Sequence, residues 1–99
     1  MSDSFEKLDN EVHQFTLEVS NKMGIHARPA AMIVRVASRF SGEIWVTKEG
    51  ERVNAKSIMG IMMLAAAKGT NLSFECKKEV AKDFETAMCD LFASKFQDE

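Results

Sequence analysis

The chain has 99 residues, of which 45% are hydrophobic and 28% are charged, a length and composition that fit one globular domain rather than a disordered segment. The formal net charge of −2 argues against a nucleic-acid-binding protein, because phosphate contacts need an excess of Lys and Arg. The sequence lacks the basic start and apolar run of a secretory signal and any stretch apolar enough to span a bilayer, so we expect a cytoplasmic protein without direct membrane contact.

The first part of the chain predicts an extension, a strand and a helix. Residues 1–11 are mostly polar and show no periodicity, so we interpret them as a flexible N-terminal extension, with the domain occupying residues 12–99. Phe15, Leu17 and Val19 alternate with polar residues, which predicts a strand with one buried face. Apolar residues at helical spacing then predict an amphipathic helix over about 27–39, in which Pro29 is tolerated in the first turn.

The middle of the chain predicts a hairpin followed by a second helix. Residues 44–47 have the β-branched and aromatic content of a strand, and residues 52–54 form a short return strand after a turn at 48–51. The hydroxyl of Ser57 can cap a helix that runs from Ile58 to about Ala65.

The last part of the chain predicts a strand and a helix. Leu72, Phe74 and Cys76 alternate with polar residues, and apolar positions between Val80 and Leu91 follow at helical spacing. The predicted order is therefore βαββαβα. We expect an α+β open-faced sandwich, in which a four-stranded antiparallel sheet has three helices on one face and solvent on the other.

The segment Gly24-Ile25-His26-Ala27-Arg28-Pro29-Ala30 places a histidine at the beginning of a helix. The first amides of a helix, here those of Ala27 and Arg28, have no intrahelical partner and can bind an anion. Arg28 adds a guanidinium that can pair with a phosphoryl group. An isolated histidine before a helix is more often a cap or a surface residue, but the adjacent Arg28 and Pro29 favour an anion site that contains a nucleophile.

Two separate motifs resemble those of the HPr family of bacterial phosphocarriers. The segment Gly24–Ala30 resembles the family's phosphorylation-site signature. The segment Asn54–Gly60, followed by Ala67–Gly69, is similar to the regulatory-serine segment of Gram-positive-type members. The resemblance extends over about residues 12–96.

The resemblance implies a function and a set of partners. His26 would accept a phosphoryl group from Enzyme I, at the expense of phosphoenolpyruvate, and pass it to sugar-specific IIA domains. Arg28 would stabilise the phosphoryl group together with the amide of Ala27. Such a protein is a stoichiometric carrier rather than an enzyme. We expect it to be a monomer that needs no cofactor and no metal.

The resemblance also assigns roles around the second helix. Ser57 would be the target of an ATP-dependent serine kinase, and its phosphorylation would slow the phosphorylation of His26. Ile58, Met59 and Met62 would form an apolar docking patch, with Arg35 on its rim. These residues suit an acidic partner that has a hydrophobic groove. We expect Met63, in contrast, to pack in the core.

Three positions depart from the family pattern, and three other readings stay open. Met23 replaces a small polar residue, Trp45 is expected on the open sheet face, and Cys76–Glu79 replaces a turn of glycine and acidic residues. Cys76 and Cys89 are expected to be reduced thiols.

The main alternative is a paralogue in a regulatory, nitrogen-type phosphorelay. An HPr-like regulator without the histidine is disfavoured by His26, and a ligand-sensing domain is disfavoured because the chain has no glycine-rich ligand loop.

Overall fold

The computed structural model describes residues 11–97, which form one four-stranded sheet in the order β1-β4-β2-β3. The strands are β1 (Val12–Glu18), β2 (Trp45–Lys48), β3 (Glu51–Asn54) and β4 (Asn71–Lys77). Every neighbouring pair is antiparallel. The expected extension over residues 1–11 lies outside the described residues except for Glu11.

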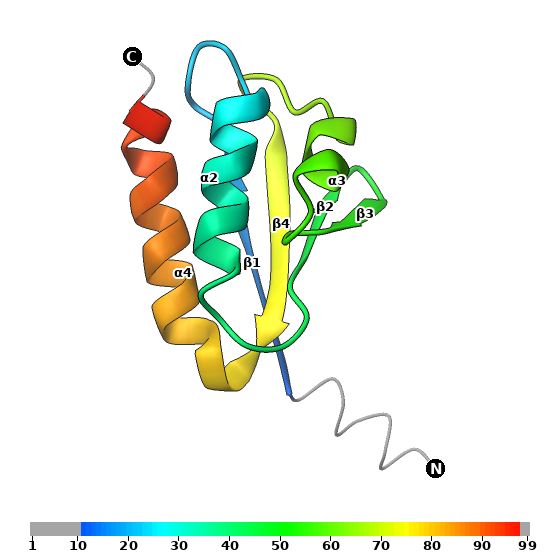
Figure 1. The fold of residues 1–99 in the computed structure, drawn as a ribbon, viewed down its shortest axis with the longest axis vertical. Helices are drawn as coiled ribbons and strands as arrows, with labels where there is room; N and C mark the ends of the chain where they lie inside the picture. Colours follow the sequence, from blue (N-terminus) through cyan, green and yellow to red (C-terminus); the bar gives the residue numbers. More distant parts are fainter. Residues whose placement is uncertain (1–10, 98–99) are drawn as a thin grey trace.

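Three α-helices cover one face of this sheet, as Figure 1 shows. They are α2 (Ala27–Ala37), α3 (Ile58–Met63) and α4 (Lys78–Ala93), and a 3₁₀ turn, η1 (Lys95–Gln97), follows α4. Helix α2 contacts both α4 and α3. The predicted open-faced sandwich and its βαββαβα order are confirmed. No helix within residues 11–97 is long and apolar enough to cross a membrane.

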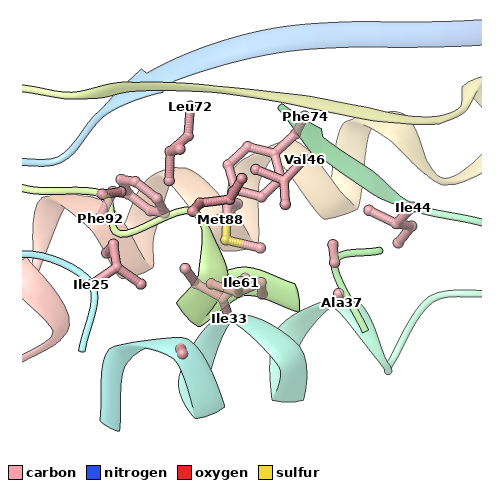
Figure 2. Packing of buried hydrophobic residues seen from close by; sticks show 14 of the residues in the cluster. Ile25, Ile33, Ala37, Ile44, Val46, Ile61, Leu72, Phe74, Met88 and Phe92 are labelled. Atoms are coloured by element: carbon pink, nitrogen blue, oxygen red, sulfur yellow. The ribbon is translucent and has the colours of Figure 1, made fainter. Parts of the chain in front are cut away.

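The core lies between the helices and the covered face of the sheet. Ile33 of α2 points toward the sheet with Ile61 of α3 beside it, and Ala37 lies at the other end of α2, on the side of Ile44 (Figure 2). Phe74 packs against the rings of Phe15, Phe84 and Phe92. Burying such aromatic and branched side chains is the main stabilising contribution to a domain of this size.

Helix and strand ends differ by a few residues from the prediction. Helix α2 ends at Ala37 rather than Arg39. The amides of Arg39 and Phe40 donate to the carbonyls three residues earlier, those of Val36 and Ala37, as in a 3₁₀ turn and not as in an α-helix. Helix α3 ends at Met63 rather than Ala65, because Ala65 adopts a positive φ of 49°. Strand β2 begins one residue later than predicted, at Trp45, and β3 begins one residue earlier, at Glu51.

The two faces of the sheet explain the positions of Trp45 and Met63. Trp45 alternates with the buried Val46 and stands on the open face, in register with Glu75 and Asn54, as predicted. The expectation that Met63 packs in the core is wrong, because its side chain is 68% exposed. Helix α3 directs Ile61 into the core, and a position two residues later points away from it.

Candidate phosphoryl-transfer site

His26 is the residue from which α2 begins. It has an extended backbone (φ −92°, ψ −163°), its carbonyl accepts the first helical bond from Ala30 at 2.9 Å, and its side chain makes no cap hydrogen bond. Pro29 has no amide, so the amides of Ala27 and Arg28 are the first-turn donors without an intrahelical acceptor. The side chain of His26 is exposed. The ring and two amide donors therefore occur together at the positive end of an eleven-residue helix.

The loop before His26 is tied to the segment that follows α3. The amide of Ile25 donates to the carbonyl of Ala66 at 2.8 Å. Gly24 has a φ of +71°, and a Cβ at this position would lie 2.7 Å from the Ala66 oxygen. Only glycine fits this close approach without strain. Met23, which precedes it, is exposed at the edge of the site.

Arg28 lies on the flank of α2 that faces α4 and the C-terminal turn. Its Nη2 donates to the carbonyl oxygen of Gln97 at 3.4 Å, and its Nη1 lies 3.9 Å from the sulfur of Met32. The contact with Gln97 was not predicted from the sequence. It joins residues 69 positions apart, and only the isolated apolar Phe96, four residues after Phe92, hinted that the C-terminus is anchored.

Ser57 caps α3 as predicted. Its Oγ accepts a hydrogen bond from the amide of Gly60 at 3.0 Å. The neighbouring Lys56 ammonium donates to the carbonyls of Phe40 and Gly42 at 2.7 and 2.9 Å, and so it is directed into the loop after α2. Ser57 is half-buried as a residue, and a phosphoryl group on its hydroxyl would add charge at the first turn of α3.

The predicted docking residues lie on two helices. Ile58, Met59 and Met62 are exposed by 44%, 74% and 43%, and all three are on α3. Arg35 is exposed on α2 and borders a groove of about 200 Å³ whose other lining residues are Met32, Val36, Arg39 and Leu91. Arg35 thus lies toward α4, and α2 separates it from the α3 methionines.

Charge is segregated along the chain in a way that the net charge conceals. Residues 19–42 and 53–74 contain six of the thirteen basic residues and none of the fifteen acidic ones. These two segments include the loop before His26, all of α2 and all of α3. The surface that these two segments form around His26 and the α3 methionines is therefore a basic, apolar surface.

Two further sets of residues lie away from His26. A cavity of about 470 Å³ borders Trp45 near the opposite end of α2, where the Arg52 guanidinium lies 4.3 Å above the indole and 3.1 Å from Glu75. Cys76 is buried, Cys89 is partly exposed, and neither forms a disulfide. Burial, with a smaller contribution from Glu85, raises the pKa of Cys76 to about 11. Within residues 11–97, no group of three His, Cys, Asp or Glu side chains could hold a metal ion.

Comparison with known proteins identifies the family. The family model for the PTS HPr component phosphorylation site matches residues 13–94. The phosphocarrier protein HPr of Treponema pallidum is 48% identical over 86 residues, covering 85% of this chain and 96% of that protein. HPr of Neisseria meningitidis serogroup A is 46% identical over 81 residues, covering 82% and 91%. A crystal structure of HPr from Thermoanaerobacter tengcongensis has a TM-score of 0.79 at 44% identity and covers 88% of this chain and 98% of that one.

The match of the family model and the extent of these relatives show that the chain belongs to the HPr phosphocarrier family of the phosphotransferase system. Members of this family carry a phosphoryl group rather than catalyse a reaction on a substrate of their own.

Proposed function

We propose that this protein accepts a phosphoryl group on His26 from phosphorylated Enzyme I, with phosphoenolpyruvate as the original source, and passes it to IIA domains of sugar transporters in the cytoplasm. A ring nitrogen of His26 forms a bond to phosphorus as the bond between phosphorus and the donor breaks. The reverse exchange with an acceptor restores His26, so the protein is left unchanged. The observation on which this proposal rests is the exposed His26 ring at the N-terminus of α2, beside Arg28.

The residues around His26 support both halves of this cycle. The amides of Ala27 and Arg28 and the Arg28 guanidinium offer hydrogen bonds to the oxygens of a phosphoryl group, which has close to two negative charges. A nitrogen–phosphorus bond is more labile than a phosphate ester, which suits a group that must be passed on. The site is open to solvent, as a carrier needs if it is to reach several partners in turn.

Partner binding is assigned to the basic, apolar surface around His26. The exposed Ile58, Met59 and Met62 would fill a hydrophobic groove, and Arg35, on the side of α2 that faces α4, would pair with acidic residues outside this groove. Methionine side chains are flexible and can repack against partners of different shape. Phosphorylation of Ser57 by a serine kinase would add negative charge at this surface and oppose the same partners. We propose a monomer, because a carrier that docks through one face needs no second copy.

The decisive experiment is labelling with phosphoenolpyruvate and Enzyme I, followed by measurement of acid-labile phosphate. The wild type should be labelled and His26→Ala should not. The chain contains one other histidine, His13, whose Nε2 lies 2.7 Å from Glu85, so His13→Gln is a matched control that should retain the label. Acid-labile label on His26→Ala would disprove the assignment. Transfer from the labelled protein to nitrogen-type acceptors, but to no sugar-specific IIA domain, would favour the regulatory paralogue.

A further inference from the structure

The chain turns back after α4 in a conformation that residues with a Cβ rarely adopt. Lys95, Phe96 and Gln97 have φ values of 54°, 56° and 54°, and none of them is glycine. The left-handed region is unfavourable for such residues because Cβ approaches the following carbonyl oxygen. Three of them in succession form only where the surrounding structure compensates.

The compensating interaction is the burial of Phe96. Its side chain is fully buried, its ring centroid lies 4.9 Å from that of Phe92, and Phe92 in turn packs edge-on against Phe74 at 5.9 Å. The amide of Gln97 also donates to the carbonyl of Ser94 at 2.9 Å. The ring of Phe96 therefore fixes the turn to the aromatic part of the core.

The turn holds a backbone carbonyl within hydrogen-bond distance of the Arg28 guanidinium. The turn lies at the same end of the molecule as the beginning of α2 (Figure 1), and the Gln97 carbonyl accepts from Arg28 Nη2 at 3.4 Å. An exposed arginine has many rotamers, and each contact removes some of them. Because the acceptor belongs to the backbone, its position depends on the turn and not on the identity of residue 97.

We propose that Phe96 is a positioning residue for Arg28. By stabilising the left-handed turn, Phe96 keeps the Gln97 carbonyl hydrogen-bonded to the Arg28 guanidinium and so limits the orientations of the guanidinium beside His26. The inference rests on the proposed role of Arg28 in phosphoryl transfer. A guanidinium has five N–H donors, so one N–H can remain hydrogen-bonded to the Gln97 carbonyl while others donate to phosphoryl oxygens. An arginine ordered in advance loses less entropy when the phosphoryl group arrives, which speeds transfer.

Two substitutions at one position test this inference. Gln97→Gly removes the side chain and keeps the carbonyl, and glycine readily adopts a positive φ. Gln97→Pro also removes the side chain, but it fixes φ near −65° and deletes the amide that bonds to Ser94. The two variants differ mainly in whether the turn can form. Phe96→Ala removes the anchor itself, and Phe84→Leu serves as a buried aromatic control that faces Phe15 and Phe74.

The first measurement is ¹⁵N relaxation of the Arg28 Nε–H group in the absence of any phosphoryl donor. We expect an ordered group in the wild type, Gln97→Gly and Phe84→Leu, and a mobile one in Gln97→Pro and Phe96→Ala. A variant with Asp98→Asn and Glu99→Gln should retain the ordered signal, because the contact is to a backbone carbonyl. If Gln97→Pro and Gln97→Gly give the same relaxation, or if the Asp98 and Glu99 charges account for the order, the positioning role is wrong.

The second measurement is the rate of phosphoryl transfer from Enzyme I. We expect Gln97→Pro to slow transfer by about threefold to tenfold relative to Gln97→Gly, as for a loss of orientation rather than of a catalytic group. In an Arg28→Ala background the two variants should transfer at the same rate, because Phe96 acts through Arg28. A mobile Arg28 with an unchanged rate would overturn the inference. Absence of transfer in the wild type would instead refute the proposed function, while the relaxation data would still decide whether the turn orders Arg28.

Discussion

The amide of Ile25 donates to the carbonyl of Ala66 across 2.8 Å, so the loop before His26 and the segment after α3 are directly bonded. Gly24 makes this approach possible, and we predict that Gly24→Ala lowers the free energy of unfolding by more than about 2 kcal/mol, through its positive φ and the overlap with Ala66. Gly50 is a matched control, because its φ is +86° and a Cβ there would meet no atom within 4 Å. Gly50→Ala should cost only about 1 kcal/mol. Urea unfolding measures both, and equal losses would contradict the steric argument.

Arg28→Ala should slow transfer to and from His26 by roughly tenfold to hundredfold, which corresponds to the loss of a charge-assisted hydrogen bond. Its effect on unfolding should be small because the side chain is exposed. Arg28→Lys should recover only part of the rate, since an ammonium supplies charge without the planar fork. Rapid-quench kinetics with phosphorylated Enzyme I test this. An unchanged rate in Arg28→Ala would mean that the helix amides suffice.

Ser57→Ala should lower the free energy of unfolding by about 1 kcal/mol, because the cap on the Gly60 amide is lost. Ser57→Asp should keep the fold, since aspartate is an equally good cap and its charge suits the helix N-terminus. Chemical unfolding of the two variants separates the loss of the cap from the effect of charge. A Ser57→Asp variant as unstable as Ser57→Ala would show that the carboxylate does not replace the hydroxyl.

Ser57→Asp should also weaken binding to Enzyme I, by several-fold to about a hundredfold, because a carboxylate beside the docking residues meets an acidic partner. The loss should shrink as salt rises, since screening reduces the repulsion. Phosphorylated Ser57 has more charge and should have a larger effect. Calorimetric titrations at low and high salt are the measurement. Equal affinities of wild type and Ser57→Asp at both salt concentrations would leave Ser57 as a cap only.

The Cys76 thiol predicts a pH dependence of stability. Burial, and secondarily the charge of Glu85, raise its pKa from an ordinary value of 9.0 to about 11. The folded state binds the proton more tightly than the unfolded chain does, so this contribution to stability is complete below pH 9.0 and is lost as the pH rises toward about 11. Cys76→Ala should show a shallower fall in unfolding free energy over this window than the wild type. Parallel curves for the two proteins would exclude the thiol as the cause.

The sequence predicted the elements that depend on local patterns. The hydroxyl of Ser57 precedes an apolar run, which predicts a cap, and Trp45 is out of phase with Ile44 and Val46, which predicts a place on the open face. The expectation for Met63 is wrong, because an apolar residue in a short helix with many methionines gives no clue to which side faces the core. The family motif, rather than periodicity, singled out His26 among possible surface histidines.

Contacts between distant residues could not be predicted. His13 bonds to Glu85 across 72 positions, and Arg28 contacts Gln97 across 69. The left-handed turn at Lys95–Gln97 was missed because it contains no glycine, the usual marker of a positive φ, and because the burial that stabilises it is tertiary. These features depend on how α4 packs against the rest of the domain.

Residues 19–42 and 53–74 contain basic but no acidic residues, so the surface that they form is positively charged although the net charge of the chain is −2. An acidic partner exerts a torque on such a molecule before contact, which turns the His26 surface toward it and raises the fraction of productive collisions. The same asymmetry means that the protein should adsorb to cation-exchange resin at a pH where its overall charge is negative, with the His26 surface against the matrix. Chromatographic retention, in other words, should depend on which face meets the resin more than on the isoelectric point.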